Sequence, residues 1–142
     1  MRKRQRRQEA IRLIIRDERV RTQRTLVDRL KAEGYVCTQA TVSRDITEMG
    51  LRKLPEGIYV LAEDLHLQRM VRDLVHDVRQ AGNLVLVKAQ AGTAPGVAAA
   101  LDATELAGII GSVSGDDTVL VVMKDEDHGS SVVETLNKFR GF

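Results

Sequence analysis

Two adjacent carboxylates are the clearest candidates for a small-molecule site in this sequence of 142 residues. Asp116 and Asp117 follow Gly115 and lie between the apolar segments 107–114 and 118–124. Ionised carboxylates are hydrogen-bond acceptors, so a pair of them can bind a ligand that carries donors. Gly-Asp is also a favoured pair in the tight turn of a β-hairpin. The local sequence therefore favours a hairpin tip, and it leaves a binding role open beside that turn.

The rest of the sequence offers little other chemistry. Asp102 ends the segment "VAAALD", where a solvated acid at a helix end is the ordinary alternative to a ligand contact. The segment "GTAPG" at 92–96 could hold an anion at a helix N-terminus, but it is also typical of a turn between a strand and a helix. The histidines have no metal-ligand spacing, and nucleophile, phosphate-loop and dinucleotide motifs are absent from the sequence. We therefore predict neither catalytic residues nor a metal site, and a protein that is not an enzyme.

A second candidate site lies in residues 39–50. Val42, Ile46 and Met49 recur at the spacing of one helix face and should face inward, which turns Arg44 outward. Arginine can donate two hydrogen bonds to a guanine edge, and serine or threonine can contact bases or phosphates. A polar helix face can also simply be solvated, but its context favours a helix that enters the major groove of DNA. The predicted DNA contacts are Gln39, Thr41, Ser43 and Arg44 on this helix and Arg52 on the segment that follows.

Three helices and a hairpin are predicted to position these DNA contacts. Thr22 and Thr38 are suitable helix N-caps, and Gly50 is a suitable C-terminal stop. Pro55-Glu56-Gly57 is a turn signal between two short apolar runs. This order is typical of a winged helix-turn-helix. The predicted helices cover residues 3–16, 23–34 and 39–50, and the hairpin covers residues 51–62.

The second half of the chain is predicted to form a small α/β domain. Its elements in order are a helix over 67–82, a strand over 83–90, a helix after "GTAPG", strands over 107–114 and 118–124, and a helix from near Ser130. This αβαββα order gives one sheet with helices on one face, so the fold class of the chain is α+β.

Charge separates the two halves. Residues 1–62 contain 15 Lys and Arg against 8 Asp and Glu, whereas residues 63–142 contain 7 against 12. A basic half suits a polyanion such as DNA. We therefore predict a DNA-binding domain at 1–62, a linker at 63–67 and a second domain at 68–142. The single cysteine, Cys37, fits a cytoplasmic protein, and the sequence contains neither a membrane-spanning run nor an apolar signal region.

Two motifs in this order resemble the bacterial arginine repressor family. They are "TQATVSRDITEMGLRKL" at 38–54 and "GTAPGVAAALD" with "IIGSVSGDDTVLVV" within 92–122. The resemblance implies a regulator of arginine metabolism genes that forms a hexamer from two trimers. It also implies that L-arginine acts as co-repressor at the trimer–trimer interface and that the N-terminal domains bind double-stranded operator DNA.

The resemblance also assigns roles to single residues. Ser43 and Arg44 match the DNA-reading residues of the family, Asp116 and Asp117 match its arginine-binding acids, and Asp102 matches the acid that ends the preceding helix. One position departs from the pattern: many members have a ligand-contacting glutamine seven residues before that acid, whereas this chain has Pro95.

Two other classes of function are compatible with parts of the sequence. An architectural DNA-binding protein, such as a recombination accessory factor, would need the basic half but not arginine. A subunit of an amino-acid-binding enzyme would need a catalytic constellation that the sequence lacks, and it would leave the basic half unexplained.

Overall fold

The computed structural model describes residues 2–142. The chain divides into two compact units, with the division after Ala62. Each unit has its own helices and its own antiparallel sheet. The segment predicted to be a linker, 63–67, lies in a 3₁₀ turn, η1 (Ala62–Asp64), and in the first turn of helix α4, where Leu67 is buried.

The first unit is a three-helix bundle followed by a small wing. Thr22 and Thr38 cap two of the helices through hydrogen bonds from the N–H groups of Thr25 and Thr41, as predicted. Gly50 ends the third helix at φ +69°, a conformation that favours glycine. The elements are α1 (Lys3–Asp17), α2 (Gln23–Ala32), α3 (Gln39–Met49), β1 (Arg52–Lys53) and β2 (Tyr59–Val60).

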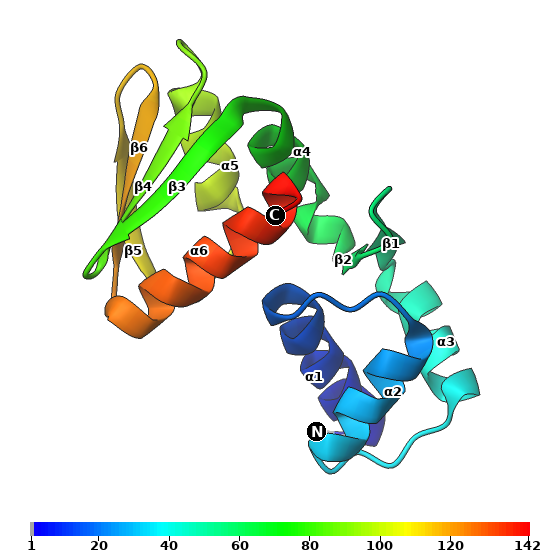
Figure 1. Cartoon of the computed structure of the whole chain (residues 1–142). Coiled ribbons are helices and arrows are strands. Elements are labelled where there is room, and N and C mark those ends of the chain that lie inside the picture. The colour runs from blue at the N-terminus through cyan, green and yellow to red at the C-terminus, as the bar shows by residue number, and fades with distance from the viewer. Residues whose placement is uncertain (1) are drawn as a thin grey trace. The chain divides into compact units, whose positions relative to one another are not determined.

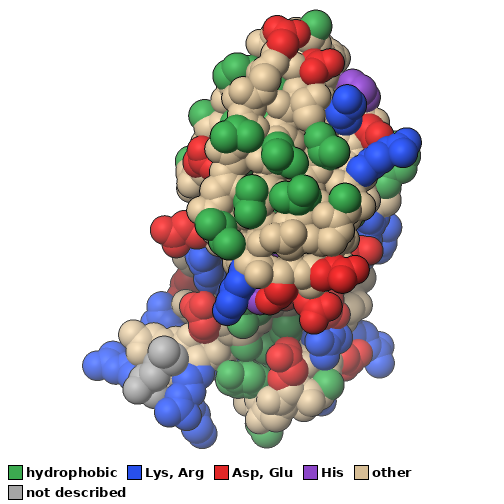
Figure 2. All heavy atoms as spheres, turned by 90° about the vertical axis from the view of Figure 1, so that its left-hand side faces the viewer, with side chains coloured by type: hydrophobic (Ala, Val, Ile, Leu, Met, Phe, Trp, Pro, Cys, Tyr) green, Lys and Arg blue, Asp and Glu red, His purple; other side chains and the backbone are tan. Residues whose placement is uncertain are grey.

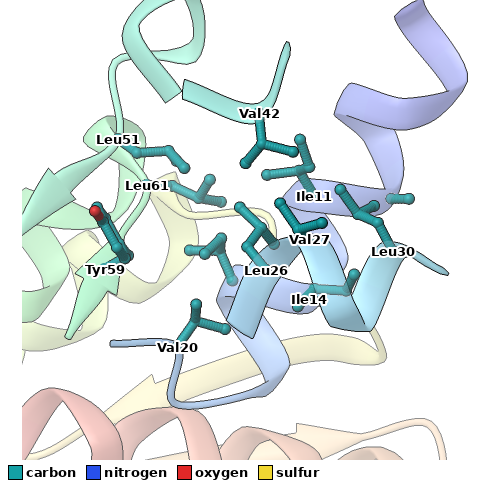
Figure 3. Packing of buried hydrophobic residues seen from close by; sticks show 12 residues of the cluster. Ile11, Ile14, Val20, Leu26, Val27, Leu30, Val42, Leu51, Tyr59 and Leu61 are labelled. Atoms are coloured by element: carbon teal, nitrogen blue, oxygen red, sulfur yellow. The ribbon is translucent and has the colours of Figure 1, made fainter. Parts of the chain in front are cut away.

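An aliphatic core holds the first unit together. Figure 3 shows its side chains pointing toward one another from all three helices and from the wing. Leu26 and Leu30 of α2 and Val42 of α3 are fully buried. The other labelled members are Ile11, Ile14, Val20, Val27, Leu51, Tyr59 and Leu61. This core fixes α3 as one wall of the bundle, so the opposite face of α3 is left for contacts with a partner.

The second unit is a four-stranded antiparallel sheet with three helices. The strand order is β3-β4-β6-β5, and Figure 1 shows all three helices on the same side of the sheet. The alternate residues Val85, Val87, Val119 and Val121 are buried beneath the helices. The elements are α4 (Leu65–Leu74), β3 (Val75–Ala81), β4 (Leu84–Ala89), α5 (Ala94–Ala103), β5 (Ile109–Ser114), β6 (Thr118–Met123) and α6 (Glu126–Arg140).

The helix predicted over 67–82 is wrong in its second half, although the α+β class is confirmed. α4 ends at Leu74, and β3 follows, so the element order is αββαββα. Val75 and Val78 are both buried because the register of β3 shifts between Val75 and Asp77, which breaks strict alternation and imitates helical spacing. Gly82, at φ +60°, is not a helix stop but the first residue of the two-residue turn between β3 and β4.

The last helix also begins earlier than predicted. The Asp125 carboxylate accepts a hydrogen bond from the N–H of His128 at 2.8 Å, and α6 starts at Glu126 rather than near Ser130. Among residues 2–142, no helix is long and apolar enough to cross a membrane. Within the same range, no group of His, Cys, Asp or Glu could hold a metal ion.

Candidate functional site

The outward face of α3 carries the predicted DNA contacts. Gln39 and Arg44 are exposed, and Thr41 and Ser43 are half-buried. Among the residues described, Arg44 has no hydrogen-bond or ion-pair partner, so its guanidinium donors remain available to a ligand. The Thr41 hydroxyl lies 3.0 Å from that of Thr38, so it belongs in part to the helix cap. Arg44 and Gln39 are thus the most exposed of these groups for contacts outside the unit, and Ser43 is half-buried.

The wing adds basic residues to the first unit. Arg52 and Lys53 form β1 and are exposed. The Lys53 ammonium lies 5.2 Å from the centre of the Tyr59 ring, within the range of a cation–π contact. Arg21 contacts the wing tip: its Nη1 donates a hydrogen bond to the carbonyl of Glu56 at 2.9 Å. A basic strand held in this way is suited to contacts with phosphates.

Sequence reasoning missed Asp45, the residue after Arg44. Its side chain is buried against α1, and its carboxylate accepts hydrogen bonds from the side chains of Arg7 and Gln8. Burial raises the pKa of Asp45, but the hydrogen bonds from Arg7 and Gln8 and the positive charges of Arg7 and Arg4 together lower the pKa below its usual value, so the folded protein keeps the carboxylate ionised. One signal was available, because a helical wheel places Asp45 beside the apolar face of α3.

The second site begins with the acid pair at the tip of the β5–β6 hairpin. Asp116 and Asp117 are exposed, and Gly115 N–H donates to the carbonyl of Thr118 at 2.8 Å to close the turn. Two further hydrogen bonds hold the backbone of the acid pair. Ala94 N–H donates to the Asp116 carbonyl at 3.1 Å, and Ala89 N–H donates to the Asp117 carbonyl at 2.7 Å.

The carboxylates of the acid pair differ in their partners. The Thr118 hydroxyl donates to Asp117 Oδ1 at 2.9 Å, whereas the Asp116 carboxylate has no partner among residues 2–142. The pair also lies beside the first turn of α5, whose unpaired N–H groups carry partial positive charge. The tip is therefore a hairpin turn whose backbone is held by hydrogen bonds and whose two carboxylates are exposed.

Within one chain, Asp102 lies away from the acid pair. It lies in the last turn of α5, where it accepts a hydrogen bond from the Ser112 hydroxyl at 3.1 Å. Ala94 and Asp102 are eight residues apart on the helix, which is about 12 Å along its axis. Asp102 instead borders an open depression of about 320 Å³ that Leu101, Leu106 and Ile110 also line.

Pro95 occupies the first turn of α5 and is exposed. It follows Ala94, whose N–H anchors Asp116. Proline suits this helical position because its missing N–H would have no partner within the helix. It supplies no side-chain hydrogen bond, so this edge of the acid pair has one polar group fewer than a glutamine would give.

Comparison with known proteins covers both units. Residues 1–67 match the family model described as the DNA binding domain of arginine repressor, and residues 71–138 match the one described as its C-terminal domain. A protein of Pelotomaculum thermopropionicum, named arginine repressor, is 41% identical over 96% of this chain and 97% of its own length.

Other relatives give the same result. Proteins with the same name from Symbiobacterium thermophilum and Thermus thermophilus are 43% and 44% identical, over 92% and 85% of this chain and 94% and 80% of their own lengths. Repressors are regulators of transcription, which confirms the prediction that the chain is not an enzyme. The chain therefore belongs to the arginine repressor family of DNA-binding transcriptional regulators.

Proposed function

We propose that this protein represses arginine metabolism genes in the cytoplasm and that it does so with L-arginine as co-repressor. The observation that carries the proposal is the acid pair, Asp116 and Asp117, which the backbone hydrogen bonds of Ala89 and Ala94 hold rigid while the carboxylates stay exposed. Two exposed acids with one hydroxyl partner between them leave acceptor positions for a cationic ligand, and one chain alone does not enclose such a site. We infer that a second protomer and the ligand complete it.

The ligand chemistry follows from the charges. If the acid pairs of two protomers approach one another, they repel each other in the absence of a cation. L-arginine carries a planar guanidinium with five donors, which matches the geometry of a carboxylate, and an α-ammonium group. One ligand can therefore pair with acids from two protomers and replace repulsion with attraction. Asp102, about 12 Å away along α5, is a candidate acid for a neighbouring protomer's ligand rather than for its own.

A surface for assembly supports this proposal. The side of the sheet away from the helices carries an apolar sheet face, defined as Leu84, Leu86, Val113, Leu120 and Val122. Val113 is 65% exposed. Figure 2 looks onto this side, where hydrophobic side chains gather in the upper part of the view. An apolar surface of this kind commonly marks a protein–protein contact, which is consistent with the proposed homohexamer of two trimers.

The DNA side of the proposal uses the first unit. Ser43 and Arg44 read bases in the major groove, and Gln39, Thr41 and Arg52 contact neighbouring bases or phosphates. Arginine-driven assembly raises operator affinity because several basic units then bind one DNA molecule. A coupling of about 1–3 kcal/mol between the two ligands is sufficient for regulation.

A binding titration in the presence and absence of L-arginine tests the proposal. The full-length protein is titrated into a labelled duplex that it has enriched from a randomised library, with an unselected duplex as control. We expect L-arginine to raise the affinity for the enriched duplex about 5- to 150-fold and to change binding of the control much less. Equal affinity with and without L-arginine would instead favour the architectural DNA-binding protein, and no enrichment would reject sequence-specific repression.

A further inference from the structure

Asp45 is an unexpected residue in a helix that reads DNA. It places a negative charge directly after Arg44, where a polyanion is the proposed partner and every phosphate would repel it. Its side chain is nevertheless buried, with only 1% of the residue exposed. Burying a carboxylate is costly unless it is fully paired. The Asp45 carboxylate is therefore expected to have hydrogen-bond partners that offset this cost.

Three hydrogen bonds join Asp45 to α1. Arg7 Nε and Nη2 donate to the two carboxylate oxygens of Asp45 at 2.5 and 2.9 Å, and Gln8 Nε2 donates to Oδ1 at 3.0 Å. The Arg7 side chain is also largely buried, at 16% exposed. A bidentate arginine–carboxylate pair has a fixed planar geometry, and this one is shielded from solvent. It therefore constrains the rotation of α3 relative to α1.

Hydrophobic attraction is not itself directional, so the buried pair adds a directional constraint to the apolar packing of α3. Recognition of a base edge requires the Arg44 guanidinium to be placed accurately. Side-chain ends lie about 5–6 Å from a helix axis, so a rotation of α3 by about 20° would move the guanidinium of Arg44 by about 2 Å. A hydrogen bond between a side chain and a base edge tolerates about 0.5 Å. Discrimination between bases therefore depends on a fixed rotation.

We propose that Asp45 is a positioning residue that sets the rotation of α3 through Arg7 and thereby gives Arg44 and its neighbours their selectivity for one DNA sequence. This proposal rests on the DNA-reading role of α3. The proposal also implies that Arg7 does not contact phosphates, because the Arg7 guanidinium is paired with Asp45.

Glu48 provides a matched comparison on the same helix. It forms an ion pair with Arg4 of α1 at 2.6 Å and accepts a hydrogen bond from Gln8 at 2.9 Å, but its side chain is 33% exposed and that of Arg4 is 63% exposed. Exposed ion pairs contribute little and are screened by salt. Asp45→Asn and Glu48→Gln therefore remove the same charge from α3, and only the first disrupts the buried pair.

The two possible roles of Asp45, as a charge and as a positioning residue, predict opposite effects of Asp45→Asn on the affinity for the selected duplex. If Asp45 acts only through its charge, the variant should bind every DNA more tightly, as we also expect of Glu48→Gln. If Asp45 positions α3, the variant loses affinity for the selected duplex and keeps or gains affinity for random duplex. The ratio of the two affinities separates these cases. A smaller fraction of folded protein would lower both affinities equally and leave the ratio unchanged.

The test measures that ratio by fluorescence anisotropy with full-length protein in saturating L-arginine. The probes are a duplex enriched by the wild type from a randomised library and an unselected duplex. We expect Asp45→Asn to lower the ratio about tenfold or more, because a displaced Arg44 loses the base contact that discriminates between sequences, and Glu48→Gln to leave it unchanged. Arg7→Lys keeps the charge but not the planar pair, so it should also lower the ratio.

Two outcomes would overturn the proposal. The first is an Asp45→Asn protein that keeps the wild-type ratio. The second applies if circular dichroism shows that Asp45→Asn does not fold: Arg7→Lys then decides, and a wild-type ratio in that variant rejects the positioning role. Failure of the DNA-reading role itself is a different result, because the wild type would then enrich no sequence from the library.

Discussion

Replacing Asp117 by asparagine is the sharpest perturbation of the proposed arginine site. The amide keeps an oxygen that can accept the hydrogen bond from the Thr118 hydroxyl, at 2.9 Å in the structure, so the turn should keep its shape. The backbone bond from Ala89 N–H to the carbonyl of residue 117 is unaffected by the change. The variant therefore differs from the wild type mainly in the loss of one negative charge from an exposed site.

The expected loss of affinity follows from the atoms that change. The second carboxylate oxygen becomes an NH₂ group, which is a donor and faces the donors of a guanidinium instead of accepting from them. Hydrogen bonds to charged groups contribute about 1.5–3 kcal/mol, and a repulsive donor pair puts the loss in the upper part of that range. A loss of about 2–3 kcal/mol corresponds to arginine binding that is about 30- to 150-fold weaker.

Isothermal titration calorimetry with L-arginine measures this change directly. Asp127→Asn is the matched control, because Asp127 is an exposed acid of the same unit and lies outside the proposed site. Asp127→Asn should bind like the wild type, and thermal unfolding without ligand should show both variants folded. The reasoning is refuted if Asp117→Asn binds L-arginine with wild-type affinity.

Four further changes have defined outcomes. Arg44→Ala should abolish discrimination between selected and random duplex in gel shifts while weakening random binding only slightly, since one phosphate contact at most is lost; retained discrimination would exclude Arg44 as a reader. Leu86→Glu, on the apolar sheet face, should lower the mass found by light scattering because a buried unpaired charge opposes assembly, and an unchanged mass would place the interface elsewhere. Pro95→Gln should strengthen arginine binding in calorimetry by about 0.5–1.5 kcal/mol, the contribution of one hydrogen bond; no gain would mean that this edge does not meet the ligand. The folded pKa of Asp45 lies below its unfolded value, so its stabilising effect is complete above about pH 4 and is lost as the pH falls through the folded value. The gap in unfolding free energy between wild type and Asp45→Asn should therefore narrow in urea titrations from about pH 6 to 3, and a constant gap would contradict the lowered pKa.

Local signals explain which parts of the fold could be predicted from the sequence. The caps at Thr22 and Thr38 and the stop at Gly50 act within one turn of their helices, so the residues beside them are sufficient to place the ends. β3 was different. Its register shift gives buried residues a spacing that also fits a helix, and only pairing with β4 decides between the two.

The candidate sites show the same limit. The positions of Asp116 and Asp117 on a hairpin tip follow from Gly115 and the flanking strands. The pairing of Asp45 with Arg7 joins residues 38 positions apart, so no local pattern reveals it. The separation of Asp102 from the acid pair depends on how α5 lies along the sheet, and the sequence contains no measure of that distance.

Sedimentation velocity with and without L-arginine tests the central claim, that the ligand acts by joining protomers through the acid pair. For the wild type, we expect added L-arginine to shift the protein toward the hexamer at concentrations where smaller species are otherwise present. For Asp117→Asn, we expect the same addition to leave the distribution unchanged. The claim would be contradicted by a wild-type protein that binds L-arginine in calorimetry yet sediments identically with and without it across the full range of protein concentration.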